Sequence, residues 1–448
     1  MSDRAAPREA ARFSSRLAFT FAAVGAAVGL GNVWRFPFEA GENGGAAFVL
    51  VYLAGVVFIA FPAFVAEMLI GKRGRASPPA ALERQAGGKG HGRLWRRVGQ
   101  AGVLANLAVM SFYSVIGGWT LSYAWAVANG LLRELTPSSA VAHLESLQLS
   151  LPAMLGWQAL FILVTLPVVG MGVRGGIERA MRIMTPAMGL LLIGLVFYAL
   201  SAGAGGRALA YLFAPDFAAL DAGTVLAAVG QALFSASVGL GGVMTYAAYL
   251  PEHTSIPRTA ASVVATDTAV ALLAGLAVFP IVFAYGLDPA GGPGLVFLSL
   301  PLAFAQMPGG VIIGAAFFLF LVLAALTSAV ALYEPAVAYL QERGLPRRYG
   351  ILAAACASWL MGLLSVFSFN LWRDWSPTPF AAISEGINIL VLPLGVLLIA
   401  IFAGWILPRA ASREFFGPGG DRIYAAWRMA ARWLLPLFLL ALLLTNIV

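Results

Sequence analysis

The sequence predicts an all-α protein that crosses a membrane many times. Of its 448 residues, 60% are hydrophobic and 11% are charged, whereas about 25% of the residues in soluble domains are charged. Apolar stretches also follow one another along the whole chain, and each reaches the roughly 20 residues that carry a helix across a bilayer. These observations exclude a soluble enzyme, a disordered protein and a disulfide-stapled secreted domain. The single cysteine, Cys356, allows no internal disulfide.

Eleven stretches are predicted to span the membrane. In chain order they cover residues 17–38, 44–70, 99–131, 153–171, 178–201, 224–250, 258–286, 310–341, 348–369, 378–406 and 424–446. The first sixteen residues are polar and basic and contain no apolar signal segment, so we expect 1–16 to form a cytoplasmic tail. Segments rich in glycine and proline, such as 286–294 and 417–420, fall in the loops.

The basic residues predict the orientation, because Lys and Arg accumulate in cytoplasmic loops. With the N-terminus inside, 24 of the 28 basic residues are cytoplasmic and four arginines remain outside. Those four are Arg35, Arg133, Arg207 and Arg373. An odd number of spans then places the C-terminus outside. The net charge of +8 lies in short loops between apolar runs, so the expected partner is the lipid bilayer and not nucleic acid.

One short string, VGLG, occurs twice, at 28–31 in the first span and at 238–241 in the sixth. Glycine disfavours a helix by about 1 kcal/mol relative to alanine, so paired glycines favour unwinding. Unwound backbone at membrane depth is tolerated only where it lines a cavity or is buried in protein. Gly-interrupted spans five helices apart are typical of inverted repeats. The alternative is close helix packing through Gly25 and Gly29.

This spacing predicts two inverted repeats of five helices and one extra span. We expect the first repeat at 17–201, the second at 224–406 and the extra span at 424–446. No soluble domain is predicted.

Polar residues at membrane depth are candidates for function, because each is costly there. The charged candidates are Glu67, Asp267, Glu334 and Glu385. The uncharged ones are Asn32, Ser235, Ser237, Thr327 and Ser328. Hydroxyl, amide and carboxylate oxygens suit an alkali cation better than a transition metal. Alternatively, each hydroxyl taken singly bonds to its own helix, and Glu334 is a structural or gating residue.

Four segments of the sequence resemble the signatures of a known family. AAVGLGNVWRFPFEAGENGGAAF at 26–48 and GQALFSASVGLGGVMTYAAYL at 230–250 resemble the first-span and sixth-span signatures of the neurotransmitter:sodium symporters. RGGIERAMRIMTP at 174–186 and LTSAVALYEP at 326–335 resemble the entry to their fifth span and their eighth span. The resemblance covers essentially the whole chain. With eleven spans, the chain is similar to the short bacterial branch of the family that carries amino acids.

The resemblance implies coupled uptake of sodium and an amino acid across the bacterial cytoplasmic (inner) membrane, with no organic cofactor and no enzymatic activity. It also implies two Na+ sites. One would use the carbonyls of Gly25, Val28 and Ala324 and the hydroxyls of Thr327 and Ser328. The other would use the Ala27 carbonyl with Asn32, Ser235 and Asp267.

The resemblance further implies a substrate pocket whose aromatic lid is Tyr113 and Phe234. The pocket residues would be Ala26, Gly29, Gly31, Val109, Tyr113, Phe234, Ser235, Ser237, Leu240, Ser328 and Leu332. Monoamine carriers of the family have an aspartate where this chain has Gly29, so the substrate must bring its own carboxylate. Because the walls are uncharged, the prediction is a neutral hydrophobic L-amino acid, aliphatic or aromatic.

The resemblance also implies which residues form the outer and inner gates. Arg35 would belong to the outer gate and would face the gating carboxylate of the tenth span. Glu385 is the expected carboxylate and Asp374 the second choice; Ser384 is the other residue that matches the family's gating position. Tyr249, Glu342 and Arg8 or Arg12 would form the inner gate, and Glu67 would brace the unwound part of span 6.

Asp267 stands where many relatives have asparagine and where animal relatives place a chloride nearby. We therefore expect Asp267 to supply the negative charge, making transport chloride-independent, and proton counter-transport through it is a weaker hypothesis.

The same features bear on three other classes of protein. Two broken helices with an aromatic lid favour an occluding carrier over an ion channel. No metalloprotease, nucleophile-elbow or P-loop motif supports a membrane enzyme. A sensor that descends from a transporter is the remaining alternative function. The sequence predicts no oligomeric state.

Overall fold

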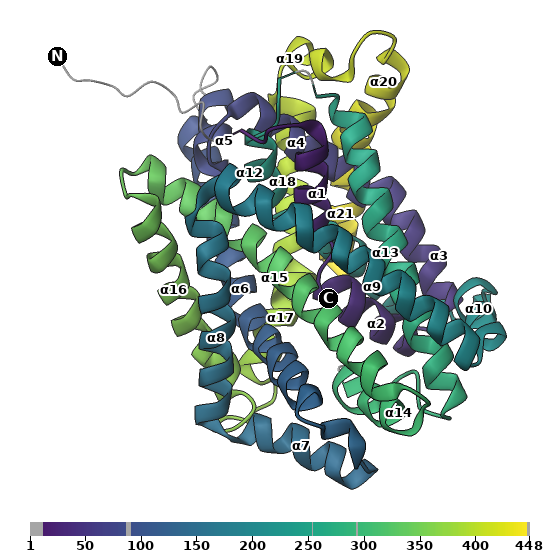
Figure 1. Ribbon diagram of the computed structural model, residues 1–448. Coiled ribbons are helices and arrows are strands. Elements are labelled where there is room, and N and C mark those ends of the chain that lie inside the picture. The colour runs from purple at the N-terminus through teal and green to yellow at the C-terminus, as the bar shows by residue number, and fades with distance from the viewer. Residues whose placement is uncertain (1–11, 87–90, 253, 293, 446–448) are drawn as a thin grey trace.

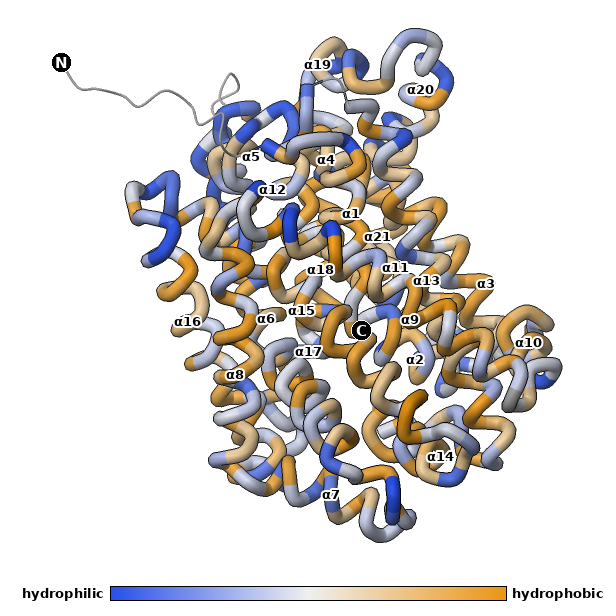
Figure 2. The backbone as a smooth tube through the Cα atoms, viewed as in Figure 1, coloured by the Kyte–Doolittle hydropathy of each residue, from blue (hydrophilic) through white to orange (hydrophobic). Residues whose placement is uncertain are grey.

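The computed structural model describes residues 12–86, 91–252, 254–292 and 294–445, and these residues form helices and no strands. Most helices run side by side in one bundle (Figure 1). Short helices lie at its two ends: α5 (Pro78–Ala86) and α19 (Arg409–Arg413) at one, α7 (Pro137–Leu149) and α14 (Leu300–Gln306) at the other. These are the loops that the charge pattern assigns to opposite sides of the membrane. Figure 2 shows hydrophilic segments gathered towards the bundle ends.

Nine helices of the described residues are long and apolar enough to cross a membrane. They are α3–α4 (Ala46–Gly74), α6 (Gly92–Ala128), α8 (Leu151–Gly170), α9 with its first turn (Val173–Ser201), α13 (Ile256–Ala284), α15 (Gly310–Glu342), α16 (Arg347–Phe367), α17–α18 (Pro379–Ile406) and α20–α21 (Asp421–Thr445). Together they correspond to nine of the eleven stretches predicted from the sequence. The largest shift is at α6, which begins at Gly92 and not at residue 99.

The remaining two predicted spans are the two that carry the glycine string, and both are broken. In the first, α1 (Arg16–Ala27) is followed by a helical segment at Gly31–Glu42 that bends away by 48°. In the sixth, α11 (Ala222–Ser235) and α12 (Gly242–Ala248) are separated by a non-helical stretch at 236–241. The breaks therefore fall at the repeated glycines.

The two breaks need glycine for different reasons. In the sixth span, Gly239 and Gly241 have φ values of +94° and +81°, a region that residues with a Cβ rarely adopt. Ser237 also lies there, with φ at +52°. In the first span Gly29 is needed for space, because a Cβ would lie 2.2 Å from the Ser328 hydroxyl oxygen and 3.0 Å from the Tyr113 hydroxyl oxygen.

Buried polar side chains satisfy the backbone groups that the breaks leave free. The Glu67 carboxylate, which is fully buried, accepts from the amides of Gly239 at 2.6 Å and Met244 at 3.2 Å. Asn106 of α6 donates to the Leu240 carbonyl at 2.6 Å. The irregular backbone is therefore held by neighbouring helices, as a low-dielectric interior demands.

In the first span, the break is satisfied in the same way. The Gly29 amide donates to Oδ1 of Asn32 at 3.1 Å, and the Leu30 amide donates to the Tyr113 hydroxyl at 3.3 Å. Gln231 of α11 donates to the Gly31 carbonyl at 2.7 Å, which ties the two breaks to each other.

Close packing against α12 leads to a prediction about Gly71. A Cβ at Gly71 of α4 would lie 2.0 Å from the Met244 carbonyl oxygen, a backbone atom that cannot move aside. We expect Gly71→Ala to destabilise the folded protein by about 1–3 kcal/mol and to lower its melting temperature in detergent. Gly194→Ala is the matched control, since a Cβ there meets nothing within 4 Å. Equal melting temperatures for the two variants would show that this packing does not limit stability.

Candidate functional site

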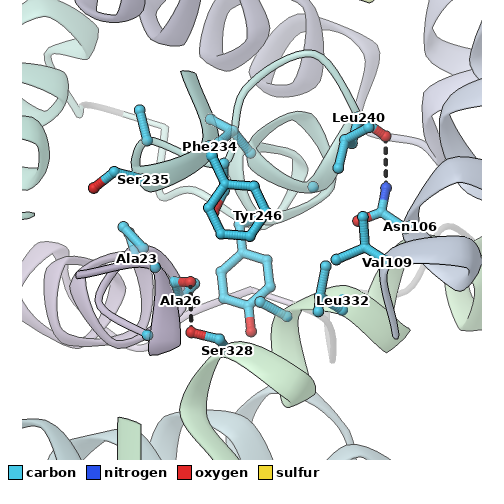
Figure 3. A pocket seen from close by; sticks show the side chains of 18 of the residues that line it. Ala23, Ala26, Asn106, Val109, Phe234, Ser235, Leu240, Tyr246, Ser328 and Leu332 are labelled. Atoms are coloured by element: carbon cyan, nitrogen blue, oxygen red, sulfur yellow. Dashed lines mark hydrogen bonds between the residues drawn. The ribbon is translucent and has the colours of Figure 1, made fainter. Parts of the chain in front are cut away.

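A pocket lies between the two helix breaks and is bounded by α6 and α15 (Figure 3). All eleven residues predicted for the substrate line it. They come from the first span (Ala26, Gly29, Gly31), α6 (Val109, Tyr113), the sixth span (Phe234, Ser235, Ser237, Leu240) and α15 (Ser328, Leu332). No charged side chain lines the pocket within the described residues.

The pocket is larger than the sequence analysis predicted, because it continues along the first half of the first span. Phe19 and Ala23 precede Ala26 on the same face of α1 and also line it. Helical spacing from Ala26 could have identified both residues.

Asn106 and Tyr246 are two further lining residues that the sequence analysis missed. Asn106 lies one turn before Val109 on α6, so helical spacing could have placed it on the pocket face. Its bond to the Leu240 carbonyl could not be predicted from spacing. Tyr246 of α12 has a buried hydroxyl with no hydrogen-bond partner among the described residues. Its hydroxyl adds a polar group to the uncharged wall of the pocket.

Beside the pocket, three predicted cation ligands meet. Asn32 donates to the Asp267 carboxylate at 2.8 Å and to the Ser235 hydroxyl at 3.0 Å. Ser235 donates to the other carboxylate oxygen of Asp267 at 2.6 Å. Asp267 is only 2% exposed, and these partners are neutral. A buried carboxylate with neutral partners is strongly disfavoured as an anion unless a cation or a proton neutralises it.

A second group of oxygens meets where α15 crosses the end of α1. Thr327 donates to the Ala324 carbonyl at 3.0 Å and lies 3.5 Å from that of Val28. Ser328 donates to the carbonyls of Ala26 at 3.2 Å and Val28 at 3.3 Å. Gly25 lies against Thr327, since a Cβ there would be 3.5 Å from the threonine Cβ. Ala27, assigned to the other cation site, lines the pocket.

On one side of the pocket, Arg35 lies over the Phe234 ring at 4.9 Å. It bonds Glu39 at 3.0 Å and the Asn388 side-chain oxygen at 2.8 Å, and its side chain is 14% exposed.

The expected pairing of Arg35 with Glu385 is wrong in this structure. Glu385 is exposed and keeps its hydration, whereas the neutral Asn388, one turn further along, reaches the arginine at little desolvation cost. Asp374 is 92% exposed and pairs with Arg373. Ser384 bonds to its own helix, at the Ala381 carbonyl.

On the other side, the inner-gate residues lie in separate contacts. Tyr249 donates to Glu334 at 2.9 Å, not to Glu342. Glu342 accepts from the Ser77 amide at 2.7 Å and hydroxyl at 2.5 Å. Arg12 pairs with Glu252 at 2.8 Å on the exposed surface. The alternative arginine, Arg8, lies outside the described residues.

The partner of Glu334 was not predicted from the sequence. This fully buried carboxylate pairs with Arg347 at 2.5 and 3.0 Å, in a two-bond geometry. The signal was present, because the short loop after the eighth span is rich in arginine.

Known proteins resemble this chain over nearly its whole length. A crystal structure of MhsT in complex with L-phenylalanine matches with a TM-score of 0.89 and 38% identity, over 97% of this chain and 99% of that one. The uncharacterized sodium-dependent transporter YhdH of Bacillus subtilis is 33% identical over 97% of each chain. An uncharacterized sodium-dependent transporter of Haemophilus influenzae is 31% identical over 97% of this chain and 98% of its own.

The match to MhsT confirms the predicted fold class, an all-α fold of two inverted five-helix repeats with broken first and sixth spans and one extra span. The model of the sodium:neurotransmitter symporter family matches residues 10–136 and 138–447. The chain therefore belongs to the sodium:neurotransmitter symporter family and is a sodium-dependent membrane transporter.

Proposed function

We propose that this symporter couples inward sodium movement to uptake of a neutral hydrophobic L-amino acid. The observation that carries the proposal is the uncharged pocket between two broken helices, with a buried carboxylate beside it. An uncharged wall favours apolar side chains, because a charged one would lose its hydration without a partner. The amino acid held by the MhsT crystal structure, L-phenylalanine, is of this class.

The break in the first span offers a place for the substrate carboxylate. The helical segment that starts at Gly31 directs its positive end towards the pocket. Tyr113 accepts a hydrogen bond from the Leu30 amide and has a side-chain hydrogen bond with Ser328; with substrate bound, its hydroxyl would donate to a carboxylate oxygen. Phe234, beneath Arg35, covers the pocket from the other side.

Two sodium ions are proposed at the two oxygen groups. At the first, Asn32 now turns its amide nitrogen towards Asp267, so a cation there requires the amide to rotate and present its oxygen. At the second, the hydroxyls of Thr327 and Ser328 would turn their lone pairs towards the ion in place of donating to carbonyls. Both groups then supply the oxygen ligands that a hard cation prefers.

The gates are proposed from the contacts that close each side. Arg35 with Asn388 and Phe234 would form the outer closure. The Glu334–Arg347 pair, with Tyr249, would form the inner one. We place the chain in a bacterial cytoplasmic membrane with the N-terminus inside and the C-terminus outside, as the arginine-rich loops indicate.

Uptake into proteoliposomes tests the function directly. With an inward sodium gradient, labelled L-phenylalanine is expected to accumulate, because each sodium ion moving down about 100 mV contributes about 2.3 kcal/mol. A potassium gradient is the control. Unlabelled leucine, methionine and tryptophan should compete, and lysine and glutamate should not. Sodium-dependent binding without accumulation would contradict transport, and strong competition by lysine or glutamate would contradict the substrate class.

Replacing chloride with gluconate tests the role of Asp267. Since its carboxylate would supply the negative charge beside the sodium ion, we expect sodium-driven uptake to be unchanged in gluconate. Measuring initial rates in both salts at equal sodium concentration decides the point. A clear loss of uptake in gluconate would show that an external anion is needed.

The variant Asp267→Asn should weaken sodium binding with little change in shape. Losing a buried charge next to a cation should raise the half-saturating sodium concentration about tenfold or more, equivalent to about 1.4 kcal/mol. The control is Glu414→Gln, which removes a carboxylate that is 58% exposed in a loop. An unchanged sodium dependence in Asp267→Asn would place the ion elsewhere.

A further inference from the structure

A second cavity, a groove between α6 and α18 (Leu392–Ile401), lies on the outer surface of the bundle. Its volume is about 590 Å³, against about 70 Å³ for the central pocket. The rim consists of Leu104, Leu390 and Leu394, which are 64%, 47% and 40% exposed. Exposed leucines at mid-span face the hydrocarbon of the bilayer, so the groove opens towards lipid.

The floor of the groove is the break in the sixth span. Gly239, Leu240 and Gly241 line it, together with the buried Met244. Irregular backbone next to hydrocarbon is tolerated only if its polar groups are satisfied. Here Asn106 bonds the Leu240 carbonyl, and Thr245 bonds that of Gly241 at 2.9 Å. The floor therefore presents an apolar surface.

In a bilayer, a groove of this kind cannot remain empty. Water is excluded from the hydrocarbon, and an unfilled void forfeits the van der Waals contacts of its walls. The material that surrounds the rim is the acyl chain of a lipid, which can enter sideways without crossing a polar barrier.

The charge at one end of the groove indicates which class of lipid binds there. Arg97 lies one turn before Ala101, a lining residue on the same face of α6, and is exposed. Arg84 of α5 and Arg93 are exposed nearby, and Arg96 pairs with Glu83 at 3.5 Å, which joins α5 to α6. Between residues 72 and 97 the chain carries eight basic residues and one acidic residue. A basic cluster at this position favours an anionic headgroup.

We propose that the groove between α6 and α18 binds one anionic phospholipid, with an acyl chain against the Gly239–Gly241 break and the phosphate at Arg97. Leu240 lines both this groove and the central pocket. The bound chain therefore packs against the outer side of the wall whose inner side faces the substrate.

Native mass spectrometry of the full-length, delipidated protein tests the proposal. We expect one phosphatidylglycerol to bind about fivefold more tightly than phosphatidylcholine, the effect of one arginine near an anionic headgroup. Arg97→Gln should abolish this preference, and Arg348→Gln, which changes an exposed arginine at the start of α16, should keep it. Equal affinity for both lipids in the unaltered protein would overturn the headgroup assignment.

Filling the groove with a bulky side chain tests whether an acyl chain binds there. Ala105→Trp places an indole among the lining residues, so the tightly bound phosphatidylglycerol should be lost. Ala353→Trp, at an exposed alanine of α16 outside the groove, should retain it. Retention in Ala105→Trp would overturn the site. If Ala105→Trp does not fold, the comparison of Arg97→Gln with Arg348→Gln decides.

Discussion

The structure depends on one constraint, that backbone freed inside a membrane protein must find partners in the protein itself. Two helices break at mid-span, and each break releases amides and carbonyls where no water can satisfy them. Glu67, Asn106 and Gln231 supply those partners from three different helices. Because these bonds hold the breaks open, backbone and side-chain oxygens can line a central pocket, and the rest of the bundle is arranged around it.

Glu67 shows why a carboxylate suits this task. As a carboxylate it only accepts hydrogen bonds, and its two oxygens serve two amides, Gly239 within the sixth-span break and Met244 in the helix that follows it. An amide side chain could serve only one of them without turning a donor towards the other. The charge is buried, but it faces backbone N–H groups, which offset part of its desolvation.

Much of this arrangement was predictable from the sequence, because it follows from residue type and spacing. The repeated glycine string predicted where both spans break, and the family resemblance implied the residues that line the pocket. The gates were less predictable, since they depend on which side chain reaches across from another helix. Glu385 and Asn388 are one turn apart in the sequence, and only the packing of α17 and its continuation shows that Asn388 meets Arg35. Likewise, Tyr249 could have bonded either acidic residue of α15, and Glu334 is the one within reach.

The oxygen groups proposed for sodium have a further consequence for the transport cycle. In the structure, Asn32, Ser235 and Asp267 bond one another, and Thr327 and Ser328 bond nearby carbonyls. A sodium ion bound at the proposed sites would therefore replace these hydrogen bonds with oxygen–ion contacts. Such an exchange would keep the sodium affinity moderate, because the protein would lose its own hydrogen bonds when it gained the ion. Moderate affinity suits a carrier, which must release sodium on the far side and then return with its sites empty.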